Sequence, residues 1–429
     1  MQILLPLDKC DRHLTCIRSK FIIKICQNDV KCKGVVNLKK IRYGIIGVGN
    51  QGGFYARYLT GGMAMMGAVP TNAELGALCD IDPAKRTMCE IMYPEKPFFT
   101  DYKEMIASGT VDAIVTTVPH YLHTEIAMYA IEHGMPVIVE KPAGVYAKAV
   151  REMNECAAKH PEVPFGIMFN QRTNKLYKQL RELVAGGSMG QIRRTNWIIN
   201  SWWRPDSYYK QSSWRATWGG EGGGVLVNQA PHQLDLFQWI CGVPSKVYAN
   251  VRYGVGRDIV VDNDVTATLT YPNGATGVFI TCTHDVIGTD RLEIDMDGGK
   301  IVVEDSKKAT VYRLKKSENE MNATISTEDM NKLFMGGGAK NIYDVEELKN
   351  ESGWGNQHGE VLRNFAAHLL EGEPLLAPGS DGINGVNLCN AILLSSWLGK
   401  EVDMPVDENL YLEELNKRIA AEGKYPTRK

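Results

Sequence analysis

Short apolar segments alternate with amphipathic segments from Ile41 to about residue 165. The apolar segments, each typical of a buried strand, are IRYGII from residue 41, ELGALC from 74, DAIVTT from 112, PVIV from 136 and FGIMF from 165. Residues 83–93, 122–133 and 146–159 place apolar side chains three and four positions apart, which indicates helices. Repeated strand and helix units predict a parallel sheet with helices on both faces. We therefore expect an N-terminal Rossmann domain, doubly wound, over residues 41–165.

Beyond about residue 190 the strands become longer, and apolar and polar positions alternate along them. They are KVYANVRY from residue 246, DVTATLTY from 264, ATGVFITC from 275, DRLEIDM from 290 and GKIVVE from 299, with turn sequences such as PNG and DGG between them. Helices are expected at 172–185, 230–241, 357–372 and 381–398, and a polar excursion with little regular structure at 316–352. Residues 166–429 should form an α+β domain with a large, mostly antiparallel open sheet and helices on one face.

An open sheet face needs a cover, and a second subunit is the usual one. We expect a homodimer or homotetramer formed through the open face of the C-terminal sheet.

Composition excludes several classes of protein. A length of 429 residues favours two domains, and a net charge of −2 gives no field that would draw the chain onto nucleic acid or a membrane. No stretch approaches the roughly 18 apolar residues needed to span a bilayer, and no secretion signal begins the chain. We expect a soluble, cytoplasmic protein.

The first forty residues differ in character from the rest of the chain. They carry nine Lys or Arg against three Asp, and they show neither clear periodicity nor turn logic. We interpret residues 1–40 as a disordered extension or a mis-assigned start, with the native start at Val35 or Val36.

The ten cysteines form no CxxC pair. Six of them are single residues in apolar or helical surroundings and are expected to be small buried hydrophobes: Cys79, Cys89, Cys156, Cys241, Cys282 and Cys389. The other four, Cys10, Cys16, Cys26 and Cys32, fit no common zinc spacing. No metal site is expected, with metal binding by these four cysteines as the alternative.

A glycine-rich loop follows the first strand. Its sequence is Gly47-Val48-Gly49-Asn50-Gln51-Gly52-Gly53, a G-x-G-x-x-G pattern before a helix expected to begin near Phe54. Gly47 would permit the tight turn, Gly49 would let a pyrophosphate approach the backbone, and Gly52 would let the helix pack on the sheet. We expect the loop, Asn50 and Gln51 included, to bind a dinucleotide.

The second predicted strand ends at Asp80. An acid at this place hydrogen-bonds the ribose diol of NAD, so NAD is expected and NADP is disfavoured. The 28 residues from Gly52 to Asp80 exceed the usual ~20 because the intervening loop, GGMAMMGAVPTNA, is long. A solvated loop acid is the alternative for Asp80.

Two further segments carry a family resemblance. Thr116-Thr117-Val118-Pro119-His120-Tyr121-Leu122-His123 follows the third predicted strand, and Glu140-Lys141-Pro142 follows the fourth. With the glycine loop, they resemble the Gfo/Idh/MocA oxidoreductases over roughly residues 41–400. The resemblance implies a nicotinamide dinucleotide near these segments, with Thr117, Pro119, His123, Glu140 and Lys141 as cofactor contacts. His123 is alternatively a buried structural histidine, and His120 is interpreted as a loop residue.

The resemblance places Lys141 beside the nicotinamide and the reacting hydroxyl. Its position at the carboxyl end of a buried parallel strand agrees with this, because open α/β sheets bind their ligands there. An ammonium group at that place can polarise a carbinol oxygen and stabilise an alkoxide. The alternative is that Lys141 only pairs with Glu140 or reaches solvent.

The segment from Gly222 to Asp235, GGGVLVNQAPHQLD, resembles the family's second signature. His232 and Asp235 lie three residues apart on a predicted helix and therefore share a face. We predict His232 as the general base, while Asp235 could orient it, bind a sugar hydroxyl or cap the helix. Where this chain has Asn228, the family pattern commonly has an aspartate. The amide of Asn228 cannot replace an aspartate as a proton carrier. Asn228 is therefore expected to bind a substrate hydroxyl.

Five of the eight tryptophans fall between residues 197 and 218. Indoles cover the C–H faces of pyranose rings, and Arg and Tyr reach hydroxyl groups. Sugar contact is expected from Trp203, Tyr208, Trp214 or Arg215, whereas Trp197 and Trp218 are expected to fill a core or a subunit interface. Arg172 matches a family position near the substrate, with a surface arginine at a helix start as the alternative.

Together these features predict an NAD-dependent dehydrogenase for a sugar, polyol or glycoside. Three other functions remain open at this point. They are a sugar-oxidising step of glycoside cleavage, a glycosidase that recycles its NAD, and a non-catalytic sugar sensor. Retention of Lys141 and His232 argues for an enzyme.

Overall fold

The alternating apolar segments form a six-stranded parallel sheet. The computed structural model describes residues 40–63, 70–335, 342–350 and 356–429. The strands of this first sheet are β1 (Ile41–Ile46), β2 (Ala73–Cys79), β3 (Phe98–Phe99), β4 (Ala113–Thr116), β5 (Val137–Val139) and β6 (Phe165–Ile167). Their spatial order is β3-β2-β1-β4-β5-β6, the doubly wound Rossmann order. The predicted Rossmann fold is confirmed.

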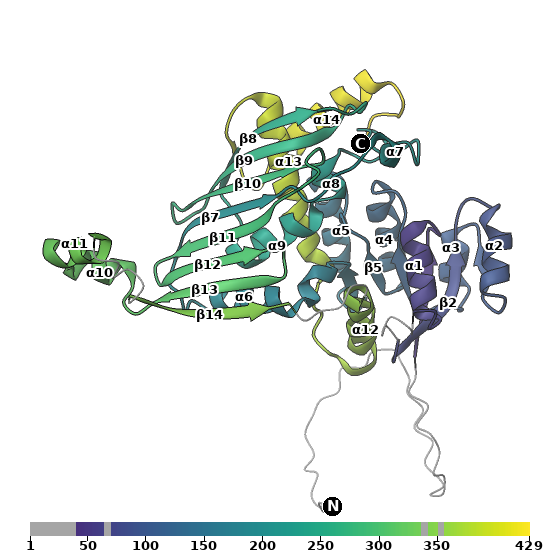
Figure 1. Cartoon of the computed structure of the whole chain (residues 1–429). Coiled ribbons are helices and arrows are strands. Elements are labelled where there is room, and N and C mark those ends of the chain that lie inside the picture. Colours follow the sequence, from purple (N-terminus) through teal and green to yellow (C-terminus); the bar gives the residue numbers. More distant parts are fainter. Residues whose placement is uncertain (1–39, 64–69, 336–341, 351–355) are drawn as a thin grey trace, which may run out of the picture. The chain divides into compact units, whose positions relative to one another are not determined.

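Helices cover both faces of this sheet (Figure 1). They are α1 (Asn50–Leu59), α2 (Lys85–Met92), α3 (Tyr102–Ala107), α4 (Leu122–Glu132) and α5 (Ala147–Lys159). One face packs on α1 and also on α12 (Asn356–Glu371), a helix far along the chain. The other face packs on α3, α4 and α5. A hydrogen bond of 2.8 Å from the Tyr43 hydroxyl to the Leu362 carbonyl ties α12 to β1.

The second sheet has nine strands and is mostly antiparallel. Its strands are β7 (Ile192–Ile199), β8 (Lys246–Tyr253), β9 (Asp262–Thr270), β10 (Thr276–Cys282), β11 (Asp290–Met296), β12 (Gly299–Glu304), β13 (Lys308–Leu314), β14 (Tyr343–Lys349) and β15 (Val402–Asp403). Their order is β14-β13-β12-β11-β7-β10-β9-β8-β15, and β7 and β10 pair in parallel. The predicted C-terminal α+β fold is confirmed.

The remaining helices belong mainly to the C-terminal part. They are α6 (Lys175–Ala185), α7 (Asp206–Tyr209), α8 (Val225–Asn228), α9 (Pro231–Cys241), α10 (Glu318–Thr324), α11 (Thr327–Met335), α13 (Gly382–Leu398) and α14 (Glu408–Glu422), with 3-10 turns at Asn170–Thr173 and Gly379–Asp381. Helices α6, α9 and α13 share one hydrophobic core with the sheet. On β8, the side chains of Val247, Ala249 and Val251 are buried in this core and those between them are exposed. One face of β8 is therefore open.

Two expectations about local structure are wrong. Helix α1 begins at Asn50, four residues before Phe54, because the glycine loop turns directly into its first helical residues. Residues 316–352 were expected to have little regular structure, but they include α10, α11 and β14. Strand β14 forms by pairing with β13, and the polar local sequence does not indicate this tertiary contact. No residue of α10 or α11 is buried.

The six cysteines predicted to be buried are all buried and free, which confirms that prediction. The described part of the chain begins at residue 40. The expectations for residues 1–40, including those for Cys10, Cys16, Cys26, Cys32 and the alternative start, therefore lie outside the described residues up to position 39. The part of the chain that is described contains no helix long and apolar enough to cross a membrane. It also contains no group of three His, Cys, Asp or Glu residues placed to hold a metal ion.

Candidate active site

The glycine loop lies at the carboxyl end of β1, between β2 and β4, where the strand order of the first sheet reverses. Gly47 has a φ of +94°, which a glycine adopts without strain. A Cβ on Gly52 would lie 2.0 Å from the Gly47 carbonyl oxygen, so Gly52 lets α1 pack tightly on the loop. A Cβ on Gly49 would meet nothing within 4 Å. The space over Gly49 is therefore open, as a bound pyrophosphate requires.

Asp80 is fixed at the end of β2, with 8% of its surface exposed. Its carboxylate accepts hydrogen bonds of 2.7 Å from the Val48 backbone N–H and 3.0 Å from the Asp82 N–H. The Lys85 ammonium lies 2.7 Å from the same carboxylate. Asp80 is thus joined to the glycine loop and is not a solvated loop acid.

Thr117 and His123 support the loops around the cofactor region. The Thr117 hydroxyl lies 2.5 Å from the Gly47 carbonyl oxygen and 3.0 Å from that of Ile46. The ring of His123 lies between two carbonyl oxygens, those of Pro142 at 2.7 Å and Val118 at 2.9 Å. Burial lowers the pKa of His123 to about 4, so its ring is neutral. These contacts match the structural alternative for His123, and the neighbouring Pro119 is exposed in the same loop.

The Glu-Lys-Pro element follows β5. Glu140 is buried, accepts a hydrogen bond from the Tyr55 hydroxyl of α1, and accepts another of 2.9 Å from the Lys141 N–H. The Lys141 ammonium donates a hydrogen bond of 3.1 Å to the Asn228 backbone carbonyl. Burial lowers the pKa of Lys141, whereas the charges of Glu140 and Glu221 act in the opposite direction. Glu140 therefore anchors the element through α1, while the Lys141 amine reaches across to the C-terminal part.

Glu221 is a further residue of the candidate site, and the sequence gave no reason to single it out. Only 1% of it is exposed, and it accepts hydrogen bonds from the Asn228 side-chain amide and, at 2.6 Å, from the Ala216 N–H. Burial raises the pKa of Glu221 to about 7. The chain thus supplies a buried carboxyl group next to Asn228, the position where the family pattern commonly has an aspartate. A lone glutamate seven residues before Asn228 gave no sequence signal, because only the glycine turn brings the two together.

His232 lies in the first turn of α9 and is electrostatically coupled to Lys141. Burial lowers the pKa of His232 well below its ordinary value, and the Lys141 charge lowers it further. Its Nδ1 atom is buried and has no hydrogen-bond partner among the described residues. No carboxylate of the described chain therefore orients this ring.

Asp235 instead forms a buried ion pair with Arg172. Both side chains are 1% exposed, and their closest nitrogen–oxygen distance is 2.6 Å. The Arg172 guanidinium also binds Asp381 at 2.6 Å and lies 5.1 Å from the centre of the Trp239 ring. Arg172 is therefore not a surface residue. The carboxylate of Asp235 is bound in an ion pair, a role that the sequence did not suggest for it.

A second histidine of the site, His358, comes from α12. The Asn170 amide lies 3.1 Å from its Nε2 atom, and its ring packs on Phe54 at 5.3 Å between ring centres. Burial lowers the pKa of His358 to about 4, and the Lys141 charge contributes. The sequence predicted the helix but gave no reason to single out this residue, because its position depends on how α12 docks.

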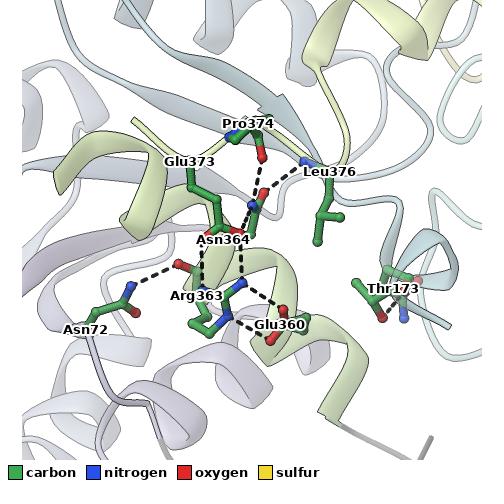
Figure 2. A network of polar contacts seen from close by, with 9 residues as sticks. Asn72, Thr173, Glu360, Arg363, Asn364, Glu373, Pro374 and Leu376 are labelled. Atoms are coloured by element: carbon green, nitrogen blue, oxygen red, sulfur yellow. Dashed lines mark hydrogen bonds and ion pairs between the residues drawn. The ribbon is translucent and has the colours of Figure 1, made fainter. Parts of the chain in front are cut away.

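A polar network fixes α12 in place (Figure 2). The Asn364 amide donates hydrogen bonds to the Glu373 carboxylate at 2.8 Å and to the Pro374 carbonyl at 2.9 Å. The Leu376 N–H donates to the Asn364 carbonyl oxygen at 2.9 Å. The Asn72 amide, just before β2, donates to the Arg363 carbonyl at 3.0 Å. This network joins α12 both to the segment after it and to the Rossmann sheet.

The tryptophan-rich segment, residues 197–218, has a buried part and an accessible part. Trp197 and Trp218 are 1% and 4% exposed, as predicted, whereas Trp203 is 42% exposed. Trp214 is half-buried and packs edge-on against His120, which is buried and bonded to the Glu221 carbonyl at 3.0 Å. The expected loop position of His120 is correct, but its burial in the site was not foreseen.

Tyr208 joins this segment to the rest of the site. Its hydroxyl oxygen accepts hydrogen bonds from Arg215 at 2.8 Å, from the Asn228 amide at 3.2 Å and from the Gln229 amide at 3.1 Å. Tyr208, Arg215 and Asn228, predicted separately from the sequence, therefore belong to one hydrogen-bonded group.

Comparison with known proteins agrees with this architecture. Residues 41–167 match the oxidoreductase family with an NAD-binding Rossmann fold, and residues 177–302 match the GFO/IDH/MocA C-terminal domain. The chain belongs to the Gfo/Idh/MocA oxidoreductase family. It is an NAD-dependent dehydrogenase.

Individual relatives are distant. Myo-inositol 2-dehydrogenase of Thermotoga maritima is 25% identical over 348 residues, which cover 80% of this chain and 92% of that protein. The rhizopine catabolism protein MocA of Rhizobium meliloti is 25% identical over 205 residues, which cover 48% of this chain and 58% of MocA.

Solved structures share the fold. The WlbA dehydrogenase of Bordetella pertussis, in complex with NADH and UDP-GlcNAcA, is 24% identical with a TM-score of 0.66, covering 86% of this chain and 100% of that one. Levoglucosan dehydrogenase with NADH and levoglucosan is 19% identical with a TM-score of 0.69 and the same coverage.

Proposed function

We propose that the protein transfers a hydride between a secondary hydroxyl of a sugar, polyol or glycoside and NAD. The observation that carries the proposal is the position of Lys141: it follows β5 of the Rossmann sheet, and its amine donates a hydrogen bond of 3.1 Å to the Asn228 backbone carbonyl, four residues before His232. The relative named myo-inositol 2-dehydrogenase supports a polyhydroxylated substrate. NAD, when bound, supplies the nicotinamide C4 that accepts the hydride.

Lys141 and His232 divide the proton chemistry in this proposal. The Lys141 ammonium polarises the carbinol oxygen and stabilises the negative charge that develops on it. His232 is neutral because burial and the Lys141 charge lower its pKa, so it can take the hydroxyl proton. Removal of the proton through His232 and polarisation by Lys141 both act on the same oxygen.

The remaining predicted site residues take two roles in the proposal. The Asn228 and Tyr208 polar atoms hold substrate hydroxyls, with Trp203, Trp214 and Arg215 around the sugar ring. Arg172 and Asp235 hold α9 in position, because their charged atoms are already bound to each other and sealed from solvent. This replaces the substrate contact that the sequence suggested for the pair.

Cofactor contacts are proposed on the same basis. The open space over Gly49 suits the pyrophosphate, with Gly47, Asn50, Gln51 and Gly52 forming its loop. The carboxylate of Asp80 suits the ribose. Thr117, Pro119, His123 and Glu140 shape the walls, and Thr117, His123 and Glu140 do so through the hydrogen bonds described above.

The experiment is NADH formation, followed by absorbance, with a panel of inositols, free hexoses and glycosides. The variant Lys141→Ala should lose turnover but still bind NADH, while Lys400→Ala, at an exposed lysine, should match the wild type. Unchanged turnover in Lys141→Ala would overturn the mechanism. Glycoside cleavage without net NADH would identify an NAD-recycling glycosidase, and binding of a sugar with no turnover of any kind would identify a sensor.

We also propose that the open face of the C-terminal sheet forms a homodimer or homotetramer. Ile198 of β7 and Ile280 of β10 are register partners, and both are half-buried on that face. Val278 of β10 and the half-exposed Tyr248 of β8 add apolar surface to the same face, which suits contact with a second copy. In a sedimentation experiment, the variant Ile280→Lys should form smaller particles than the wild type. A wild type that sediments as a monomer would refute the proposal.

A further inference from the structure

Two guanidinium groups lie on one tyrosine ring in the tryptophan-rich segment. The Arg204 Cζ atom is 5.0 Å from the centre of the Tyr208 ring, and the Arg215 Cζ atom is 4.7 Å from it. Arg215 also lies 5.0 Å from the centre of the Trp214 ring. Two like charges thus contact the same aromatic ring. Such an arrangement favours the approach of an anion.

Carboxylates of the protein compensate this charge poorly. In the described part of the chain, no carboxylate oxygen lies within 4.0 Å of Arg204, whose NH1 donates to the Trp203 carbonyl at 2.9 Å. Arg215 has a carboxylate only at 3.5 Å, that of Glu221. The Glu221 pKa of about 7 reduces its negative charge further. The pair therefore retains a net positive charge.

The hydrogen-bonding capacity of the two arginines is also incompletely used. The Nε atoms of both side chains are buried and have no hydrogen-bond partner among the described residues. Arg257 adds a third positive charge nearby. Its Nε donates to the Arg204 carbonyl at 2.6 Å, and its NH1 donates to the Gly256 carbonyl at 2.6 Å. Backbone carbonyls satisfy hydrogen bonds but do not neutralise a guanidinium.

This charge lies next to the proposed reaction centre. The Tyr208 hydroxyl, which accepts from Arg215, also accepts from the Asn228 amide, and the Asn228 carbonyl accepts from Lys141. Both Arg204 and Arg215 are close enough to lower the pKa of Lys141. A ligand bound at Lys141 would therefore have the two guanidinium groups beside it.

We propose that Arg204 and Arg215 bind an anionic group, a carboxylate or a phosphate, carried by the sugar substrate. The proposal rests on the proposed function, since it assigns the substrate class of the same site. Guanidinium groups bind both kinds of anion through paired, charge-assisted hydrogen bonds. Partial burial strengthens these bonds, and loss of one is expected to weaken binding about tenfold or more.

The test uses three ligands that differ only at C6, namely D-glucose, D-glucuronate and D-glucose 6-phosphate. Each is titrated into the NADH-loaded enzyme by calorimetry, which requires no turnover. We expect at least one anion to bind about tenfold or more tightly than glucose. Preference for glucuronate would assign a carboxylate, and preference for the phosphate ester would assign a phosphate. Equal or weaker binding of both anions, or no binding of either, would overturn the proposal.

Substitutions test whether the preference for an anion depends on Arg204 and Arg215. Arg204→Gln and Arg215→Gln should each lower the ratio of anion to glucose affinity about tenfold or more while retaining NADH binding. Arg252→Gln, at an exposed arginine of β8 that pairs with Asp264, is the control and should leave the ratio unchanged. Arg204→Lys keeps the charge without the planar fork and should lose part of the preference.

The outcome is distinguishable from failure of the proposed function. An anion preference that disappears in the arginine variants would stand even if no sugar were oxidised. Conversely, NADH formation from neutral sugars without any anion preference would support hydride transfer and refute this inference.

Discussion

The side-chain amide of Asn228 donates a hydrogen bond to the buried carboxylate of Glu221, and the backbone carbonyl of Asn228 accepts one from Lys141. Asn228 therefore links a carboxyl group to the proposed catalytic amine without carrying a proton itself. The family pattern commonly has an aspartate at this position, and here the acid is contributed from seven residues earlier.

The carboxyl group of Glu221 should make stability depend on pH. Its pKa in the folded protein is about 7 because of burial, above the ordinary value of 4.5, so the folded state binds the proton more tightly. Stability from this group is present below about pH 4.5 and is lost as pH rises through about 7. The loss is at most about 3 kcal/mol.

Urea unfolding of the wild type and Glu221→Gln tests this expectation. The variant should gain stability relative to the wild type between about pH 5 and about pH 8, because glutamine has no charge to bury. Other buried carboxyl groups, such as Asp262, are present in both proteins and cancel. Glu346→Gln, at an exposed glutamate of β14, is the control. A difference that does not change with pH would contradict the prediction.

The glycine loop allows a matched pair of substitutions. Gly52→Ala should destabilise the fold by about 1–3 kcal/mol or more, because its Cβ would meet the Gly47 carbonyl at 2.0 Å. Gly49→Ala should leave the melting temperature nearly unchanged, since its Cβ meets nothing within 4 Å, but should weaken NAD binding about tenfold. Thermal melting and NADH titration distinguish the two. Tight NAD binding by Gly49→Ala would argue against a pyrophosphate at this loop.

The ion pair between Arg172 and Asp235 should matter for stability. Asp235→Asn leaves the buried Arg172 guanidinium with Asp381 as its remaining carboxylate partner, and the expected cost is about 3–5 kcal/mol in urea unfolding. The double variant Arg172→Met with Asp235→Leu should regain much of this loss, because it removes both buried charges. Reduced sugar affinity with unchanged stability in Asp235→Asn would instead favour the substrate role predicted from the sequence.

Asp80 should control the choice between NAD and NADP. Asp80→Ser removes the carboxylate that would repel a 2′-phosphate and releases the Lys85 ammonium now 2.7 Å away. NADH affinity should fall and the ratio of NADPH to NADH affinity should rise about tenfold or more. Asp82→Ser, two residues further on and exposed, is the control. An unchanged ratio in Asp80→Ser, measured by nucleotide fluorescence, would remove Asp80 from the ribose site.

The sequence by itself determined the Rossmann sheet, most of the C-terminal strands and the glycine loop. These features depend on local periodicity, on turn residues and on the absence of a side chain at Gly47 and Gly49, all of which are written in neighbouring positions. The choice of Lys141 as a candidate site residue also came from the sequence, through the family resemblance, and its place at the carboxyl end of a buried strand agreed with it.

Only the tertiary structure decided which distant side chains meet. Helix α12 returns to the Rossmann sheet and brings His358 into the site, and Arg172 is paired with Asp235 from a helix 63 residues later. Glu221 and Asn228 are near in sequence, yet their contact requires the glycine turn between them, with φ values of +90° at Gly222 and +150° at Gly223. Such contacts are selected by packing and desolvation over the whole fold, and no single segment records them.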